Sequence, residues 1–157
     1  MTPAVVLAGI AAALLPGPLS GQSLDDGLWV LRFVGSDAVL ADVASIQRDG
    51  DSVRMRSLLV FKEDVRLAGP LYWGGAHQWT FDCRAGTADL RHFAFLMGGG
   101  NYGEGVLDRN PPYAAATSRR EAALLAVACD PASAGEADAD NLEDAVRVGR
   151  AALRLAN

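Results

Sequence analysis

Glycines recur in a short stretch past the middle of the chain, at Gly98, Gly100 and Gly103. This Gly-x-Gly-x-x-Gly spacing is that of a dinucleotide-binding loop, whose glycines let the backbone approach a pyrophosphate at the start of a helix. Here Pro111 and Pro112 follow within a few residues, so no helix can begin directly behind the glycines. We therefore expect a glycine-rich turn or bulge between two strands, without a bound cofactor.

The glycine-rich stretch also carries three side chains that a turn would expose, Asn101, Tyr102 and Glu104. Loops hold a large share of binding residues, because a rigid scaffold presents them at the surface. We therefore expect a flexible connection whose three side chains contact a protein partner. The alternative is a plain turn without a ligand.

The two histidines, His77 and His92, carry the side chain that titrates closest to neutral pH. Paired with Asp82 or Asp89, either would form a general base or part of a metal site. Alternatively, both lie in a loop or at a strand edge without a catalytic role. The chain has no Gly-x-Ser-x-Gly motif, and its cysteines lack the spacing of zinc ligands. The sequence favours a protein without catalytic residues, cofactor or metal, and a small hydrolase-like periplasmic enzyme using a histidine is the alternative.

The N-terminal segment contains an uncharged apolar run from Ala4 to Leu15, followed by the helix-breaking residues 16–18. The run is shorter than the roughly 20 residues that a membrane-spanning helix needs. It predicts a secretory signal peptide that is cleaved near residues 20–22. The alternative is a buried N-terminal helix. No cysteine follows the run directly, so we expect no lipid anchor.

The chain has two cysteines, Cys83 and Cys129. In an exported protein an even pair predicts one disulfide bond, because oxidising compartments preserve it. In a cytosolic protein the same residues would be two free thiols in the core. The choice between these alternatives depends on the signal peptide.

A net charge of -5 with a single lysine, Lys62, provides no basic surface for nucleic acid or anionic lipid. The length of 157 residues fits one folded domain. We expect a signal peptide at residues 1–21, an α+β domain at 22–130, and an acidic linker with a C-terminal helix at 131–157.

Residues 28–34, 38–48 and 52–61 have the composition and alternation of three β-strands. In the third of these, Arg54 and Arg56 alternate with apolar or small residues. The pattern predicts an antiparallel meander with one buried face and one solvated face.

Residues 71–83 are rich in aromatic side chains around two glycines, which predicts either a hairpin or a strand interrupted by a bulge. Another strand is expected at residues 92–97, and the proline pair at 111–112 should end regular pairing. Aromatic residues of this part are expected to fill the core, and the alternative is a surface for a sugar ring or a protein partner. They are Tyr72, Trp73, Trp79 and Tyr113.

After the proline pair the pattern becomes helical. A first helix is expected at residues 118–129, where Ser118-x-x-Glu121 has the spacing of a capping box. The side chains expected to face the core are Ala122, Leu125 and Cys129.

A second helix is expected at residues 142–155, with acids at its start and arginines toward its end, as the helix dipole favours. Its apolar stripe should pack on the sheet, and its arginines should form a solvated face or, alternatively, contact an acidic partner. The stripe is Leu142, Val146 and Leu153, and the arginines are Arg147, Arg150 and Arg154.

Three stretches together resemble the bacterial surface-adhesin protein E family. They are LADVASIQRDGDSVRMRSLLVF, WTFDC and SRREAALLAVAC, which occur in the family's order between about Leu28 and Cys129. The resemblance implies an exported protein whose antiparallel sheet is tied to a helix by Cys83 and Cys129, without a catalytic centre. The acidic linker and second helix lie beyond the matched region.

The sequence therefore predicts an α+β fold, with about six antiparallel strands, one or two C-terminal helices packed on the sheet, and one disulfide. The expected function is that of an exported, non-catalytic, adhesin-like binding protein in the periplasm or at the cell surface. A purely structural factor without a ligand is a further alternative.

Overall fold

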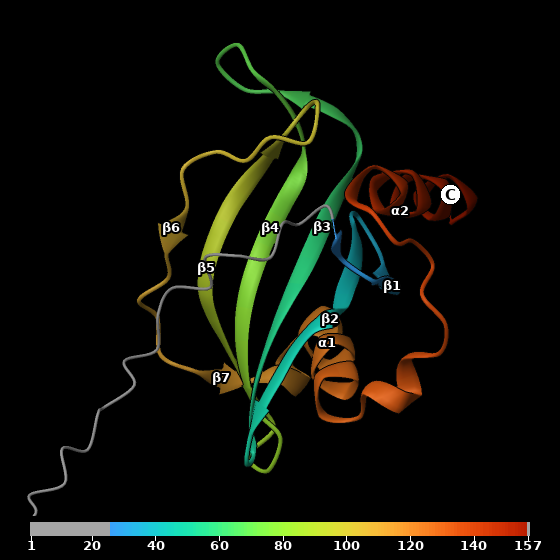
Figure 1. Cartoon of the computed structure of the whole chain (residues 1–157). Coiled ribbons are helices and arrows are strands. Elements are labelled where there is room, and N and C mark those ends of the chain that lie inside the picture. Colours follow the sequence, from blue (N-terminus) through green and yellow to red (C-terminus); the bar gives the residue numbers. More distant parts are fainter. Residues whose placement is uncertain (1–25, 157) are drawn as a thin grey trace, which may run out of the picture.

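The structure is a computed structural model that describes residues 26–156. The predicted signal peptide at residues 1–21 lies outside the described part. The described chain forms one seven-stranded antiparallel sheet followed by two α-helices (Figure 1), so the predicted α+β fold is confirmed. The strands are β1 (Trp29–Val34), β2 (Ala38–Asp49), β3 (Ser52–Arg66), β4 (Leu71–Asp82), β5 (Thr87–Met97), β6 (Val106–Leu107) and β7 (Tyr113–Ala114).

The first six strands lie in sequence order across the sheet, and β7 returns to pair with β5. Residues 71–83 therefore form one strand with register shifts and not a hairpin. The expected strand at 92–97 begins earlier, at Thr87. Regular pairing stops at the proline pair as expected, since residues 108–112 lie outside the strands, and it resumes only with the two residues of β7.

Both faces of the sheet are covered, each by one helix. On β3, Val53 and Met55 pack in the cluster that contains α1 (Arg119–Cys129), whereas Leu58 and Val60 pack in the cluster that contains α2 (Leu142–Leu155). The expected solvated face was therefore wrong, since α2 supplies the apolar cover that the strand pattern alone did not reveal. Figure 1 shows both helices beside the β1–β3 half of the sheet, with the upper parts of β4 and β5 extending away from them.

Helix α1 has nearly the predicted extent, but its N-terminus and buried face differ from the prediction. Ser118 occupies the N-cap without a side-chain hydrogen bond, and Glu121 is buried and pairs with Arg120 at 2.8 Å. The capping box was therefore wrong. The fully buried apolar residues are Leu124, Val127 and Ala128, whereas the predicted Ala122, Leu125 and Cys129 are only partly buried and Leu125 packs against the same core cluster.

The adjacent leucines in this alanine-rich helix explain that error, because the sequence is compatible with burial of either face of α1.

Burial, and then the carboxylate of Glu121, raise the pKa of Tyr113 above its ordinary value of 10.0. Tyr113 thus lies beside the start of α1, with part of its ring exposed.

Helix α2 has the predicted bounds and buries the predicted stripe. Asn141 caps it by accepting a hydrogen bond from the Asp144 N–H at 2.9 Å. Gly149 lies directly against the sheet, where an added Cβ would come within 3.1 Å of the Val60 Cβ. Arg150 does not belong to a solvated stripe, because it pairs with Asp64 at 2.6 Å.

Two 3₁₀ helices lie in the C-terminal half of the chain, at Ala115–Thr117 and Pro131–Ala134. The second lies in the acidic connection between α1 and α2. This connection returns to the edge of the sheet, where Trp29 and Ala139 form a β-bridge and the Leu31 N–H donates to the Asp138 carboxylate at 2.8 Å. The outer edge of β1 is thus occupied by a segment from late in the chain.

The predicted disulfide joins Cys83, just after β4, to Cys129 at the end of α1. Arg48 of β2 reinforces the same junction by donating to the Cys129 carbonyl at 2.6 Å. The end of the helix is therefore held covalently to one strand and by a hydrogen bond to another. Among residues 26–156, no helix has the length and apolar character needed to cross a membrane.

Replacing Cys83 with serine is expected to lower the free energy of unfolding by about 4 kcal/mol, because the bridged residues are 46 apart and cross-linking restricts the unfolded chain. Urea denaturation followed by tryptophan fluorescence measures this change. Cys129→Ser should give the same loss, and a reductant should destabilise only the wild type. Equal urea midpoints for Cys83→Ser and the oxidised wild type would contradict the structure.

Candidate functional site

A row of polar side chains crosses the sheet on the face that α2 partly covers. Asp42 on β2 lies opposite Arg56 on β3, Arg56 lies opposite Gln78 on β4, and Gln78 lies opposite His92 on β5. Directly opposite residues of antiparallel strands project from the same face, so the four side chains are neighbours. We call these four residues the polar row.

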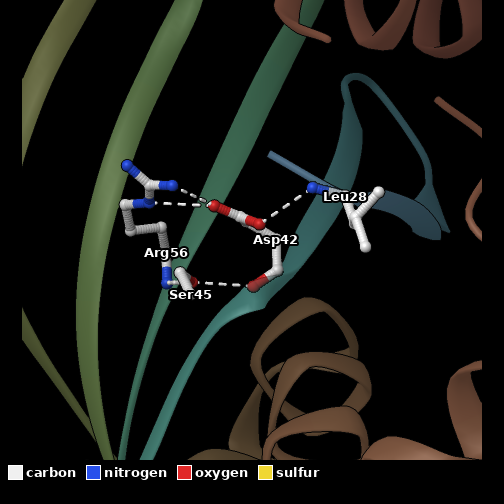
Figure 2. Close-up of polar contacts among 4 residues, drawn as sticks. All are labelled: Leu28, Asp42, Ser45 and Arg56. Carbon is white, nitrogen blue, oxygen red and sulfur yellow. Dashed lines mark hydrogen bonds and ion pairs between the residues drawn. The ribbon is translucent and has the colours of Figure 1, made fainter. Parts of the chain in front are cut away.

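The polar row begins with a buried ion pair (Figure 2). The Asp42 side chain is fully buried and that of Arg56 is 11% exposed. Arg56 donates from Nε and from one terminal nitrogen to the same Asp42 oxygen, at 2.9 and 2.5 Å. The other Asp42 oxygen accepts the Leu28 N–H at 3.2 Å. The Asp42 carboxylate on β2 therefore connects β3, through Arg56, with the residue that precedes β1, Leu28.

Ser45 completes this arrangement at an irregularity of β2. The ladder between β2 and β3 is interrupted between Asp42 and Gln47. Within the gap the Ser45 hydroxyl donates to the Asp42 carbonyl at 2.7 Å and accepts the Arg56 N–H at 2.8 Å. The hydroxyl thus satisfies backbone groups that the bulge would otherwise leave without partners.

Beyond the ion pair, the polar row borders a pocket of about 140 Å³. Its floor is formed by Ala76 of β4 and Ala94 of β5, which lie opposite each other. In the same cross-strand row, the β3 position is Leu58, which α2 covers. The pocket therefore exists where large apolar residues give way to alanine and where the cover of α2 has ended.

The outer wall of the pocket comes from the glycine-rich connection after β5. Tyr102 and Gly105 line the pocket, and Tyr102 also packs against the core cluster of α2. The connection is tied to the sheet by the Leu96–Tyr102 bridge and by the Gly103 N–H donating to the Phe95 carbonyl at 2.9 Å. The glycine-rich connection thus forms one wall of the pocket and is attached to the edge strand β5.

The three residues of the predicted partner-binding loop differ in their exposure to solvent. Asn101 and Glu104 are exposed, whereas Tyr102 is half-buried and lines the pocket. The glycines support this path, because Gly99 and Gly100 adopt φ of 89° and 82°, which favour residues without a Cβ. The short strand β6 follows the glycines, as expected for a connection between strands.

The two histidines lie on opposite faces of the sheet and cannot act together. His92 belongs to the polar row, whereas His77 lies opposite Ser57 on the face of α1. The His77 ring lies between the rings of Trp79 and Phe93, at centroid distances of 5.7 and 5.3 Å. The His77 ring therefore packs among core aromatic residues, although His77 and His92 both border the pocket.

Burial, and then the nearby Arg120 guanidinium, lower the pKa of His77 from 6.5 to about 4. The two predicted carboxylate partners are engaged elsewhere. Asp82 accepts backbone N–H groups of the following turn, and Asp89 pairs with Arg91 at 2.8 Å. His77 is thus a neutral core residue at physiological pH.

The arrangement of the pocket is suited to binding. The guanidinium of Arg56 donates hydrogen bonds, while the Gln78 amide and the His92 imidazole offer both donors and acceptors. Among residues 26–156, no group of three or more His, Cys, Asp or Glu residues could hold a metal ion. Sequence analysis did not identify Arg56 or Gln78, because only the register of the strands brings them together with His92 and Tyr102.

Replacing Arg56 with methionine is expected to destabilise the fold by about 3–5 kcal/mol, because it leaves the buried Asp42 carboxylate without its charged partner. Urea denaturation provides the measurement. Arg54→Met is the matched control, since Arg54 is exposed on the same strand and should change stability by less than about 0.5 kcal/mol. A double variant, Asp42→Leu with Arg56→Met, should recover much of the loss. Equal stability of Arg56→Met and Arg54→Met would contradict a structural role for the ion pair.

The lowered pKa of His77 makes stability depend on pH. Below pH 6.5 the unfolded chain binds a proton at this residue, whereas the folded chain does so only near pH 4. The contribution of His77 is therefore complete above pH 6.5 and falls by about 3 kcal/mol as the pH drops to 4. His77→Phe, which keeps an aromatic ring in the core, should remove this part of the acid destabilisation. Parallel urea titrations of both proteins at pH 7 and 4.5 give the free energy of unfolding at each pH. If His77→Phe loses as much stability between pH 7 and 4.5 as the wild type does, the prediction is refuted.

No family model, curated protein or solved structure matches this chain. The resemblance to the protein E family therefore stays a prediction.

Proposed function

We propose that this chain is an exported, non-catalytic binding protein of the periplasm or cell surface, which engages a partner at the pocket beside the polar row. The observation that carries the proposal is the convergence of Arg56, Gln78, His92 and Tyr102 around one hollow of the sheet. Concave sites with an apolar lining and a few convergent polar groups are the usual form of a binding site.

Two features support export. The disulfide between Cys83 and Cys129 is of a kind that persists in oxidising compartments. The apolar run at Ala4–Leu15 has the length of a signal-peptide core. The adhesin-like character of the proposal rests on the sequence resemblance, together with the exposed Asn101 and Glu104 in the same connection as Tyr102.

Binding is favoured over catalysis by the way in which the polar groups are held. Arg56 shares a hydrogen-bonded pair with a buried carboxylate, so its position is fixed. His92 lies opposite Gln78, and neither Asp82 nor Asp89 supplies the carboxylate that a general-base pair would use. A fixed row of hydrogen-bonding groups orients a ligand without requiring a proton transfer.

A photoreactive amino acid at position 104, introduced in the native host, is expected to crosslink a partner. Replacing Tyr102 with alanine should reduce the yield several-fold, because the wall of the pocket loses its ring, whereas Tyr102→Phe should retain most of it. The same photoreactive residue at Arg84 is the matched control, since Arg84 is exposed in the turn between β4 and β5. Equal crosslinking from positions 84 and 104, or no effect of Tyr102→Ala, counts against the proposal.

The same preparations test export. Mass spectrometry of the isolated protein should show a chain that begins near residues 20–22 and contains an oxidised Cys83–Cys129 pair. A retained N-terminus with two free thiols would contradict the exported location and leave the pocket to be assessed independently.

A further inference from the structure

The pocket has one polar side and one apolar side. Arg56, Gln78 and His92 form a cross-strand row along one side, and Ala76 and Ala94 form the adjacent row. A ligand that fills this space has to present hydrogen-bonding groups along one edge and an apolar surface to the alanine methyl groups. The Tyr102 ring provides a second apolar surface at the outer wall.

The charges around the pocket favour a neutral ligand. Among the described residues that line the pocket, Arg56 is the one lysine or arginine, and the buried Asp42 carboxylate balances it at 2.5 Å. An anion would have to compete with Asp42, whose loss of pairing is costly in a buried position. A cation would find no carboxylate among the lining residues that belong to the described part of the chain, 26–156.

The hydrogen-bonding groups favour hydroxyls over other neutral groups. A hydroxyl both donates and accepts, so it matches the Gln78 amide and the His92 imidazole, which also do both. Hydroxyls on adjacent ring carbons would lie along the polar row, while the C–H face of the ring would rest on Ala76, Ala94 and the Tyr102 ring.

The size of the pocket limits the ligand to one ring. Its volume of about 140 Å³ is well below the roughly 300–1,000 Å³ of pockets that enclose drug-sized molecules. We infer that the pocket binds a neutral pyranose ring, such as the terminal hexose of a glycan. The inference rests on the proposed binding function and specifies the chemistry that the site recognises.

Titration of the ¹⁵N-labelled oxidised protein with neutral methyl hexopyranosides tests this assignment by NMR. At least one of the glucoside, galactoside and mannoside should shift the backbone amides of residues 76–78, 92–94 and 102–105 in a saturable manner. An affinity in the millimolar range is expected for one ring with few hydrogen bonds. Acetate and a hexuronate serve as anionic probes and should bind more weakly than the neutral glycoside.

Two variants link the shifts to the pocket. Ala94→Leu should abolish binding by filling the floor, and Gln78→Ala should weaken it about tenfold by removing a member of the polar row. Arg54→Gln is the matched control outside the pocket and should leave the affinity unchanged. The amide spectrum away from the pocket reports whether each variant remains folded.

Non-saturable shifts with all three glycosides, unchanged affinity in a folded Ala94→Leu variant, or a preference for the anionic probes would overturn the pyranose assignment. The Tyr102-dependent crosslink distinguishes this failure from failure of the proposed function. A persistent crosslink without glycoside binding would mean that the pocket recognises a partner through other chemistry.

Discussion

The structure depends on the pairing of Asp42, a carboxylate that is fully removed from water. A buried charge is tolerated only when charged and hydrogen-bonded partners surround it, and Arg56, Leu28 and the Ser45 bulge supply this environment. The same pairing fixes the Arg56 guanidinium at the border of the pocket. One requirement of the interior thus determines the path of β2, the entry into β1 and the first position of the polar row.

The pocket follows from unequal covering of a sheet that has two buried faces. Helix α1 is joined to the end of β4 through the disulfide, and α2 approaches β3 closely through Gly149. Neither helix extends over Ala76 and Ala94, where small side chains leave the sheet hollow. The glycine-rich connection then encloses the hollow from the outer edge with Tyr102. The pocket therefore results from the positions at which α2 and the glycine-rich connection end on the sheet, and no single sequence motif encodes it.

Local sequence patterns predicted the local elements well, including the first three strands, α2 and the disulfide. The sequence did not reveal which face of α1 is buried, because Leu124 and Leu125 are adjacent and most of their neighbours are alanine. It also gave no sign that Arg56 is buried, since a β3 arginine becomes a core residue only through a partner 14 positions away. For the candidate site, the sequence singled out Tyr102, which lines the pocket, but its companions depend on the registers of four strands. Registers are long-range properties that alternation within one strand does not specify.

Both edges of the sheet are closed by segments that are synthesised later than the strands they protect. Asp138 and Ala139 occupy β1, while Tyr102, β6 and β7 occupy β5. Open strand edges pair readily with other chains, and nascent proteins expose them until the covering segments have emerged. The β1 edge of this protein is therefore covered only once residues near 139 have been synthesised. Until then β1 presents unpaired backbone groups of the kind with which other chains can pair.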